Sequence, residues 1–352
     1  MGGAEQVLHT LCAALNDDFE QHVIFFHDGP YRAKLAALGI ATTHIGGRWH
    51  RYDPFFFVRL YRAIKAYAPD VIHTLLWAAN VSTRLVILLQ RTPIVSAYHN
   101  QLDDDHVLRA LLDRCTMARS DKLIAVSAAV ADSLVRCNRW LPAERITVID
   151  NGAELPTNKR MKTRAELSLP DDAFVIGAIG RFVPIKQFDL LLHICAKLFA
   201  AHKGMYLVLI GYGQLEQQLR ALAQSLGIGD RVRFVIGEPA QPYLPLFDCF
   251  VQPTAAEGLS IALLEAMMAC VPPVVMSVDG SHPVVQPMVC GYVIPADTPD
   301  ALAHAIEALY TVVPWRKTLG EQARRRVDEH FSAAAMAFKY KTLFGGFVHK
   351  NF

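Results

Sequence analysis

The sequence predicts two α/β domains, each a doubly wound parallel sheet wrapped by helices. Short apolar runs rich in β-branched or aromatic residues alternate along the chain with longer segments of helical period. The 352 residues also exceed what one hydrophobic core usually supports, which favours two domains. Two such domains facing each other form a cleft lined by the carboxyl ends of their strands. We therefore expect the chemistry to lie in strand-to-helix loops.

The first domain is predicted to span residues 1–155. Its apolar runs are each followed by a polar or glycine turn, as expected for buried strands that feed helices. The segment 333–347 near the end of the chain has helical spacing and is expected to pack back on this domain. The predicted strands of the first domain are 22–27, 71–75, 94–97, 123–126 and 146–149.

A polar segment, residues 156–172, is predicted to link this domain to a second one. It is rich in Lys and Arg and carries prolines at positions 156 and 170, which sets it apart from the apolar runs on either side. The second domain is predicted to span residues 173–330. Its predicted strands are 174–179, 207–210, 232–236, 249–252, 274–276 and 292–294, with helical segments such as 215–226 and 301–310 between them.

Charge and cysteine usage exclude several classes of protein. The formal charge is +2 with acids and bases interspersed, so the chain has no electrostatic footprint for nucleic acid. The seven cysteines are scattered without C-x-x-C spacing, which indicates a reducing compartment and no structural zinc. No apolar run reaches the roughly 18 residues of a bilayer span, and no basic then apolar leader follows Met1. We expect a cytoplasmic protein, and peripheral contact with a membrane surface stays open.

The segment from Gln252 to Met267 carries the strongest chemical signal. A predicted strand gives way to a loop with Glu257, after which Ser260 can cap a helix that contains Glu265. The two carboxylates can face one cleft, while the free N–H groups near the helix start present a positive end to an anion. A ligand that combines hydroxyls with phosphate suits this arrangement. The structural alternative is that Glu257 only favours the helix dipole and Glu265 points to solvent.

Two cations, Arg181 and Lys186, lie in another predicted strand-to-helix loop. Gly180 directly precedes Arg181 and lets the backbone turn there. Two cations at the carboxyl end of a strand fit a diphosphate whose leaving charge must be stabilised. The alternative is that both are solvated surface cations.

His99-Asn100 follows the predicted strand 94–97, at the edge that is expected to line the cleft. A histidine there could hydrogen-bond a sugar hydroxyl or move a proton, and a hydrogen-bonded structural role is the alternative. Asp103-Asp104-Asp105 has the D-x-D spacing of some metal-dependent transferases. Its place just before a helical stretch favours an acidic helix start, so we predict no metal site.

Two further segments carry weaker signals. Gly211-Tyr212-Gly213 matches half of a dinucleotide-binding fingerprint, but Glu216 occupies the place of the third glycine. The segment 48–67, rich in aromatic and basic residues, could contact an anionic bilayer. More often, such a stretch is a helix packed on its sheet with its charges outward.

These motifs, in this order, resemble the retaining glycosyltransferases of the GT-B fold, in particular family 4. The resemblance covers nearly the whole chain and implies two Rossmann-like domains that face a cleft. The segments that carry it are Gly2-Gly3-Ala4-Glu5, His99-Asn100, Val126-Ser127, Ile149-Asp150-Asn151-Gly152, Gly180-Arg181 with Lys186, Gly211-x-Gly213, and the E-x7-E element from Glu257 to Glu265.

The resemblance also implies a role for each residue. Arg181 and Lys186 would bind the donor diphosphate, and Glu265 would hold the nucleotide ribose. Glu257 would contact the donor sugar as a catalytic residue, and His99 would lie near the centre of transfer. The remaining donor-binding residues that the resemblance implies are Gly2, Gly3, Gly211, Gly258, Leu259 and Ser260.

The implied reaction is the transfer of a hexose from a UDP- or GDP-linked donor to a hydroxyl of a glycan or lipid-linked saccharide. The anomeric configuration is retained, and neither a metal nor any cofactor besides the nucleotide-sugar co-substrate is implied. Front-face attack, with the departing phosphate helping to take the acceptor proton, would leave most of the catalysis to positioning and charge stabilisation. The first domain would be the acceptor side, and the biological role would be polysaccharide or lipopolysaccharide biosynthesis.

The chain departs from the family pattern at its start and in two later places. A family member normally begins with a strand before the Gly-Gly loop, so we expect the first N-terminal strand to be missing through a late start or truncation. Because that strand is usually central, its neighbours would keep unpaired backbone groups. Cys270 stands where a glycine is common, and residues 279–283 follow the usual Gly-Gly-x-Pro-Glu loop only loosely. Two alternatives therefore stay open: a non-catalytic or truncated GT-B protein that binds a sugar nucleotide or a partner, and a GT-B nucleotide-sugar epimerase.

Overall fold

A computed structural model of the chain describes residues 3–46, 53, 55–87, 92–100, 107–155, 160–278 and 283–348. The chain forms two compact units. Unit 1 comprises Met1–Gly152 together with Ala333–Phe352, and unit 2 comprises Ala153–Ser332. Residues 160–172 of the predicted linker lie in unit 2, where Lys162 N donates to Pro242 O at 2.9 Å.

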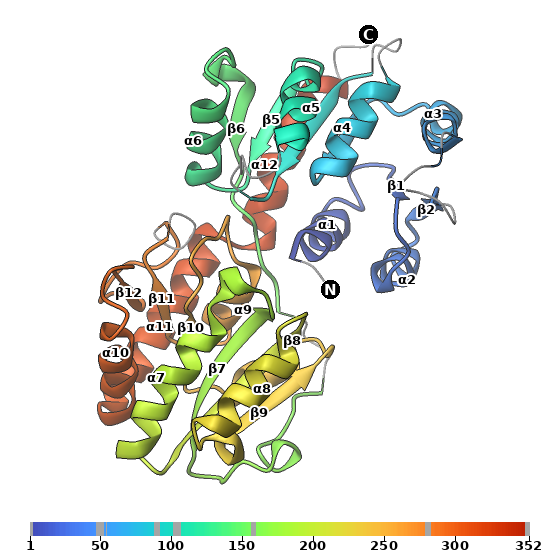
Figure 1. Cartoon of the computed structure of the whole chain (residues 1–352). Helices are drawn as coiled ribbons and strands as arrows, with labels where there is room; N and C mark the ends of the chain where they lie inside the picture. Colours follow the sequence, from blue (N-terminus) through green and yellow to red (C-terminus); the bar gives the residue numbers. More distant parts are fainter. Residues whose placement is uncertain are drawn as a thin grey trace. The chain divides into compact units, whose positions relative to one another are not determined.

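Unit 2 is built on one six-stranded parallel sheet in the order β12-β11-β10-β7-β8-β9. The chain runs outward from β7 to β9 and then returns to place β10 on the other side of β7 (Figure 1). Ligands of such sheets bind at this reversal, beyond the carboxyl ends of the two strands. The strands are β7 (Phe174–Arg181), β8 (Met205–Tyr212), β9 (Val232–Ile236), β10 (Cys249–Gln252), β11 (Pro273–Met276) and β12 (Tyr292–Ile294).

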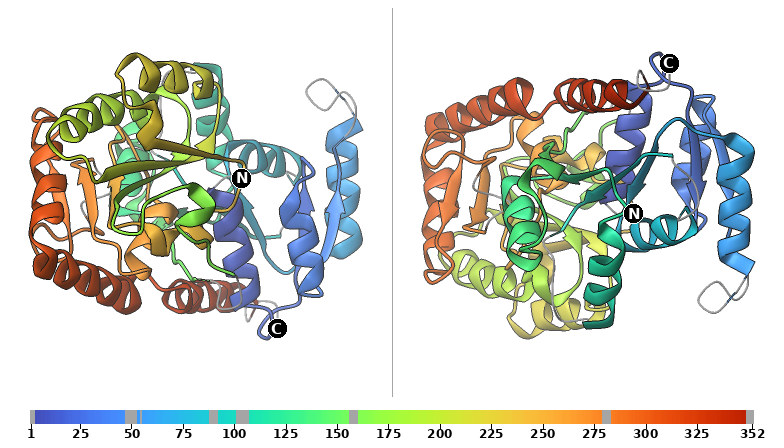
Figure 2. Two further views of the ribbon diagram at one scale, coloured as in Figure 1. Left: turned by 90° about the horizontal axis from the view of Figure 1, so that it is seen from below. Right: turned by 90° about the horizontal axis from the view of Figure 1, so that it is seen from above.

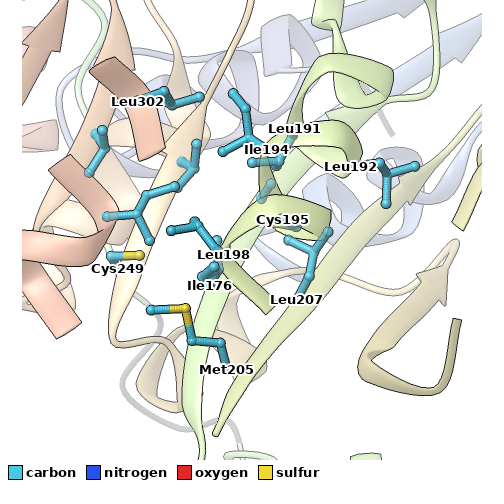
Figure 3. Close-up of a cluster of buried hydrophobic side chains, with 14 of the residues drawn as sticks. Ile176, Leu191, Leu192, Ile194, Cys195, Leu198, Met205, Leu207, Cys249 and Leu302 are labelled. Atoms are coloured by element: carbon cyan, nitrogen blue, oxygen red, sulfur yellow. The ribbon is translucent and has the colours of Figure 1, made fainter. Parts of the chain in front are cut away.

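Helices cover both faces of this sheet (Figures 1 and 2). The residues that alternate along β7, β8 and β10 toward one face join α7 and α10 in an apolar cluster (Figure 3). Ile176, Cys195, Leu207 and Cys249 in this cluster are fully buried. The elements around the sheet are η2 (Ala165–Leu167), η3 (Pro184–Lys186), α7 (Phe188–Ala201), α8 (Glu216–Ser225), η4 (Gly229–Arg231), η5 (Gln241–Leu246), α9 (Ile261–Met268), α10 (Ala301–Thr311) and α11 (Val313–His330).

Unit 1 contains a four-stranded parallel sheet, β3-β4-β5-β6, and a separate parallel pair, β1-β2. The strands are β1 (His22–Phe25), β2 (Ala41–His44), β3 (Ile72–Leu75), β4 (Ile94–Tyr98), β5 (Lys122–Ala125) and β6 (Ile146–Val148). The helices are α1 (Gly3–Ala14), α2 (Pro30–Ala37), α3 (Phe55–Tyr67), α4 (Trp77–Val86), α5 (Val107–Met117) and α6 (Ala128–Cys137), with η1 (Ala143–Arg145) before β6.

The division of unit 1 into two sheets leaves β1 with β2 as its sole strand partner, and β3 with β4, among the described strands. Yet β1 is packed on both faces: Val23 joins the cluster of Cys12 and Leu35, while Ile24 packs on the α3 side with Phe56. A strand covered on both faces is typical of the interior of a doubly wound sheet.

The last helix, α12 (Ala333–Val348), belongs to unit 1 although it follows unit 2 in sequence (Figure 1). Tyr340 and Phe344 on this helix contact the ring of His73 on β3, with ring centroids 5.2 and 5.6 Å apart. Lys339 forms an ion pair with Asp150 at 3.4 Å. Aromatic and charged contacts therefore hold the end of the described chain on unit 1.

The strand prediction was correct for eleven strands and missed β2. The segment Ala41–His44 is short, half-exposed and has no large apolar side chain, so its sequence lacks the signal of a buried strand. Cys270, which stands where a glycine is common, directly follows the C-cap Ala269 of α9 and has a φ of +58°. The N–H of Val271 bonds to Ala266 O at 3.0 Å, which completes a helix end of the kind that glycine usually occupies.

None of the helices in the described ranges is long and apolar enough to span a lipid bilayer.

Candidate active site

The loop after β10 and the start of α9 are the centre of the candidate site. Ser260 caps α9 as predicted, because its Oγ accepts a hydrogen bond from Leu263 N at 3.3 Å. Gly258 and Leu259 directly before it are buried, so the backbone of this loop is enclosed by protein. Glu257 lies half-buried at the outer end of the loop.

Glu265 is a buried carboxylate, with 3% of its surface exposed. Gln241 at the start of η5 donates from Nε2 to Glu265 Oε1 at 2.8 Å. The alternative that Glu265 points to solvent is therefore wrong. A carboxylate accepts several hydrogen bonds and donates none when ionised, so this one suits a ligand that presents hydroxyl groups.

Lys186 forms an ion pair with Glu257, in which Lys186 Nζ donates to Glu257 Oε2. The two side chains are 18% and 16% exposed, so the alternative of a solvated surface cation is wrong for Lys186. Arg181, the last residue of β7, is exposed and forms no ion pair within the described residues. The charge of Lys186 is thus compensated by Glu257, whereas exposed Arg181 is accessible to an anion.

Backbone contacts lock the β7–α7 loop onto the β10–α9 loop. Ile185 O accepts hydrogen bonds from Ala255 N at 2.9 Å and from Thr254 Oγ1 at 3.0 Å. Thr254 is 1% exposed and also donates to Ala256 O at 2.9 Å. The two loops that carry Lys186 and Glu257 are therefore fixed in register, in the manner that preorganised sites require.

Gly211 and Gly213 let β8 approach the end of β7 closely. A Cβ on Gly211 would lie 1.9 Å from Gly180 O, and one on Gly213 would lie 2.5 Å from Phe182 O. Gly213 also has a φ of +155°, which side chains rarely adopt. In the structure these glycines allow the close packing of β8 against Arg181 and Phe182 at the carboxyl end of β7.

Two buried amides near the site were missed by the sequence reasoning. Gln252, the last residue of β10, is 4% exposed, and neither its Nε2 nor its Oε1 has a hydrogen-bond partner within the described residues. Oε1 of Gln241 is likewise buried and unpartnered there. Since buried polar groups are normally hydrogen-bonded, these atoms point to a polar ligand. The signal available in the sequence was the polar residue that ends the apolar run Cys249–Gln252.

His99 lies in unit 1, directly after β4. Burial, with a smaller contribution from neighbouring His73, lowers its pKa to about 4. Burial also lowers the pKa of His73 to about 4, although Val95 O lies 3.0 Å from its Nδ1. The Nε2 atoms of both rings are buried and have no partner within the described residues. Both histidines are therefore neutral at neutral pH.

The remaining predicted residues fall in different parts of the chain. Gly3 is the first residue of α1 in unit 1. Gly2 and the D-x-D segment at residues 103–105 lie outside the described residues. In the described part of the chain, no group of three or more His, Cys, Asp or Glu side chains is placed to hold a metal ion.

Comparison with known proteins decides the family. Residues 159–326 match the family model of glycosyl transferases group 1, and residues 1–155 match that of glycosyltransferase family 4. Together the two matches cover nearly the whole chain. The chain belongs to the family 4, group 1 glycosyltransferases. The resemblance to family 4 drawn from the sequence motifs is thereby confirmed.

The curated relatives of this chain include glycosyltransferases with different names. D-inositol 3-phosphate glycosyltransferase 1 from Catenulispora acidiphila is 29% identical over 269 residues, which are 68% of this chain and 63% of that protein. The lipopolysaccharide core biosynthesis glycosyltransferase LpsE from Rhizobium meliloti is 31% identical over 181 residues, or 51% and 52% of the two chains. The matches thus span about half to two thirds of these curated relatives.

The fold of the chain is similar to that of HepE from Anabaena in its crystal structure with UDP-glucose. The TM-score is 0.87 at 20% identity, over 98% of this chain and 96% of HepE. The predicted fold class, GT-B with two Rossmann-like parallel α/β domains, is confirmed.

Proposed function

We propose that this protein transfers a hexose from a UDP- or GDP-linked donor to a hydroxyl of a glycan or lipid-linked saccharide, with retention of the anomeric configuration. The observation that carries the proposal is buried Glu265, which is held by Gln241 and lies in the helix that follows the loop of Glu257, whose carboxylate pairs with Lys186. Hydroxyl-binding and phosphate-binding groups thus lie together in unit 2. The family match and the nucleotide sugar bound by HepE support the same donor class.

In this proposal the residues of unit 2 divide the donor between them. Arg181 and Lys186 neutralise the diphosphate, because charge-assisted hydrogen bonds to phosphate are stronger than neutral ones. Glu265 accepts hydrogen bonds from the ribose hydroxyls, and Glu257 contacts the transferred sugar. The backbone of Gly258, Leu259 and Ser260 at the start of α9, together with Gly211, completes the unit 2 part of the donor-binding set. The proposal adds Gly2 and Gly3 of unit 1 to this set.

The reaction breaks the bond between the anomeric carbon and the phosphate oxygen and forms a bond from that carbon to the acceptor oxygen. The acceptor proton passes to the leaving phosphate on the same face of the sugar. The cations stabilise the charge that develops on the departing diphosphate. One hydrogen-bond donor in such a position typically lowers the activation barrier by about 3 kcal/mol. In this proposal His99 is a catalytic residue near the centre of transfer. Its low pKa makes it a neutral hydrogen-bonding group at neutral pH.

We also propose that the reaction needs neither a metal ion nor a cofactor other than the nucleotide sugar. Arg181 and Lys186 supply positive charge of the kind that a metal supplies in other transferases. Activity that is unchanged by a chelator, and is not raised by added Mg²⁺ or Mn²⁺, would support this part of the proposal. A strict dependence on one of these ions would refute it.

The proposed role is the assembly of a cell-surface polysaccharide or lipopolysaccharide on the cytoplasmic side of a membrane. LpsE, named for lipopolysaccharide core biosynthesis, supports this setting. With a lipid-linked saccharide as the acceptor, the enzyme would work as a peripheral protein at the inner face of the membrane.

The first experiment incubates the purified chain with a panel of UDP- and GDP-sugars, with and without saccharide acceptors. We expect nucleotide release that depends on one donor and one acceptor, and a product with the anomeric configuration of the donor. A new sugar epimer formed from the donor alone would instead identify an epimerase. Tight nucleotide binding without release under any condition would identify a non-catalytic protein.

The second experiment separates the two glutamates. Glu265→Ala should weaken binding of the free nucleoside diphosphate, while Glu257→Ala should mainly lower kcat. Glu329→Ala, which removes an exposed carboxylate of α11, is the matched control and should change neither quantity. Calorimetry and steady-state kinetics check the split, and equal, negligible effects of both site variants would sink the assignment.

A further inference from the structure

The helix α3 of unit 1 has a second apolar face that its core packing does not use. Phe56, Leu60 and Ile64, spaced by four residues, form its buried face against Ile94 and its neighbours. On the opposite side Phe55 is 67% exposed. Val58 is 44% exposed, and Phe57 is 43% exposed although its ring also contacts that of Phe56, with centroids 5.4 Å apart. The structure thus agrees with the alternative of a packed helix with its charges outward, and it also leaves apolar side chains exposed over the first half of α3.

The exposed side of α3 is also cationic. Arg62 and Lys65 are exposed one and two turns beyond Val58, and the helix contains no acidic residue. The single carboxylate near its start, Asp53, is already paired with Arg59 at 2.7 Å. Exposed aromatic and aliphatic side chains next to uncompensated cations are typical of helices that lie in the headgroup region of an anionic bilayer.

Within unit 1, α3 lies at the margin beside β1 and β2 (Figures 1 and 2). A second copy of the chain is a poor occupant for this face, because a symmetric contact would set the cations of two α3 helices against each other. An anionic phospholipid surface complements both the apolar and the charged residues.

We propose that the exposed face of α3, formed by Phe55, Phe57, Val58, Arg62 and Lys65, is the surface by which this protein binds anionic phospholipid membranes. The inference rests on the proposed peripheral location but not on the catalytic assignment. The aromatic and aliphatic side chains would enter the headgroup boundary, while the two cations contact lipid phosphates. Because only three apolar side chains would enter the membrane, we expect binding to be reversible. Because two cations contribute to it, we expect binding to weaken as salt is added.

The test is co-sedimentation of the full chain, without nucleotide sugar, with vesicles of phosphatidylcholine alone or mixed with phosphatidylglycerol. We expect binding to the anionic vesicles that falls with ionic strength. Phe55→Ser with Val58→Ser, and separately Arg62→Gln with Lys65→Gln, should each weaken that binding about tenfold or more. All four side chains are exposed, so the variants should keep the thermal stability of the parent.

Matched controls sit elsewhere on the protein. Phe338→Ser removes a 71% exposed phenylalanine of α12, and Lys203→Gln with Lys317→Gln removes two exposed cations of unit 2. These variants should bind vesicles like the parent. Equal binding by the α3 variants and their controls would overturn the proposal, as would equal binding to neutral and anionic vesicles. Nucleoside diphosphate affinity, measured by calorimetry on the same samples, tests the proposed function independently.

Discussion

Lys186 and Glu257 form an ion pair between two loops of unit 2 that are 71 residues apart in sequence. Both side chains are largely buried, and the loops beneath them are joined through Ile185 O. Each charge therefore compensates the other before any ligand arrives. A donor diphosphate that binds Lys186 must share it with Glu257 or displace Glu257 toward the sugar.

Replacing Lys186 tests this relationship. Lys186→Met keeps most of the side-chain volume but removes the charge, so the affinity for a nucleoside diphosphate should fall about 10- to 100-fold, the worth of a charge-assisted hydrogen bond. Isothermal calorimetry measures the change, and Lys203→Met in the same unit is the control that should leave affinity unchanged. An unchanged affinity in Lys186→Met would mean that the cation serves only to neutralise Glu257.

Replacing Gln252 with an apolar residue should raise the stability of the protein and lower its affinity for nucleotide. Gln252→Leu removes two unpartnered polar atoms from a buried position, which should stabilise the protein by about 1 kcal/mol and raise Tm by about 2–4 °C. If the amide serves a polar ligand, nucleotide affinity should fall in the same variant. Differential scanning fluorimetry with and without nucleotide measures both, and Gln217→Leu on the exposed side of α8 is the control. A lowered Tm would show that the amide has a structural partner.

Cys270 should accept glycine with a gain in stability. Its φ of +58° is strained for a residue with a side chain, and its side chain is exposed, so little burial is lost on truncation. Cys270→Gly should raise the free energy of unfolding by about 0.5–1 kcal/mol. Cys270→Ala keeps a Cβ and should bring no such gain. Urea unfolding of both variants checks the prediction, which fails if alanine stabilises as much as glycine.

The two buried histidines of unit 1 should make stability depend on pH. Their pKa values are about 4 in the folded protein and near 6.5 when unfolded, so between these values the unfolded chain binds more protons. The free energy of unfolding should therefore fall as pH is lowered from about 6.5 toward 4, by up to roughly 3 kcal/mol per histidine. Urea titrations at a series of pH values measure this slope.

A variant isolates the contribution of one ring. His73→Asn should reduce the loss of stability between about pH 6.5 and 4.5, a window that lies above the usual range of most carboxylates. His193→Gln replaces an exposed histidine of α7 and should keep the parental slope. The same slope in both variants would contradict the assignment of the effect to the buried pair.

Sequence reasoning reached the architecture because buried parallel strands leave a strong local pattern. The strands β10 and β12 were predicted to the residue, since each is a compact apolar run between turn residues. The strand β2 was missed because its residues Ala41–His44 are partly exposed, and strand pairing rather than hydrophobicity defines it. Local pattern thus finds strands that face a core, and misses those held chiefly by a neighbour.

The candidate site was predictable in its charged residues and less so in its partners. Glu257 and Lys186 lie between a strand and a helix, Arg181 ends β7 and Glu265 lies in α9, so their type and order could be recognised in the sequence. The pairing of Lys186 with Glu257 depends on how two distant loops pack, which no local spacing encodes. The support of Glu265 by Gln241 has the same cause, because the two residues lie in different elements and are joined only by the fold.

The separation of the strands of unit 1 into a pair and a group of four has a consequence for how the protein unfolds. Among the described strands, the six-stranded sheet of unit 2 has two edge strands, whereas the two sheets of unit 1 have four. Amide groups along such edges are protected only by packing, so their protons should exchange with solvent at lower free energy than those of β7 and β8. We therefore expect unit 1 to unfold in steps and unit 2 to unfold as one cooperative body. At high protein concentration the edge strands of unit 1 would pair with extended segments of other molecules.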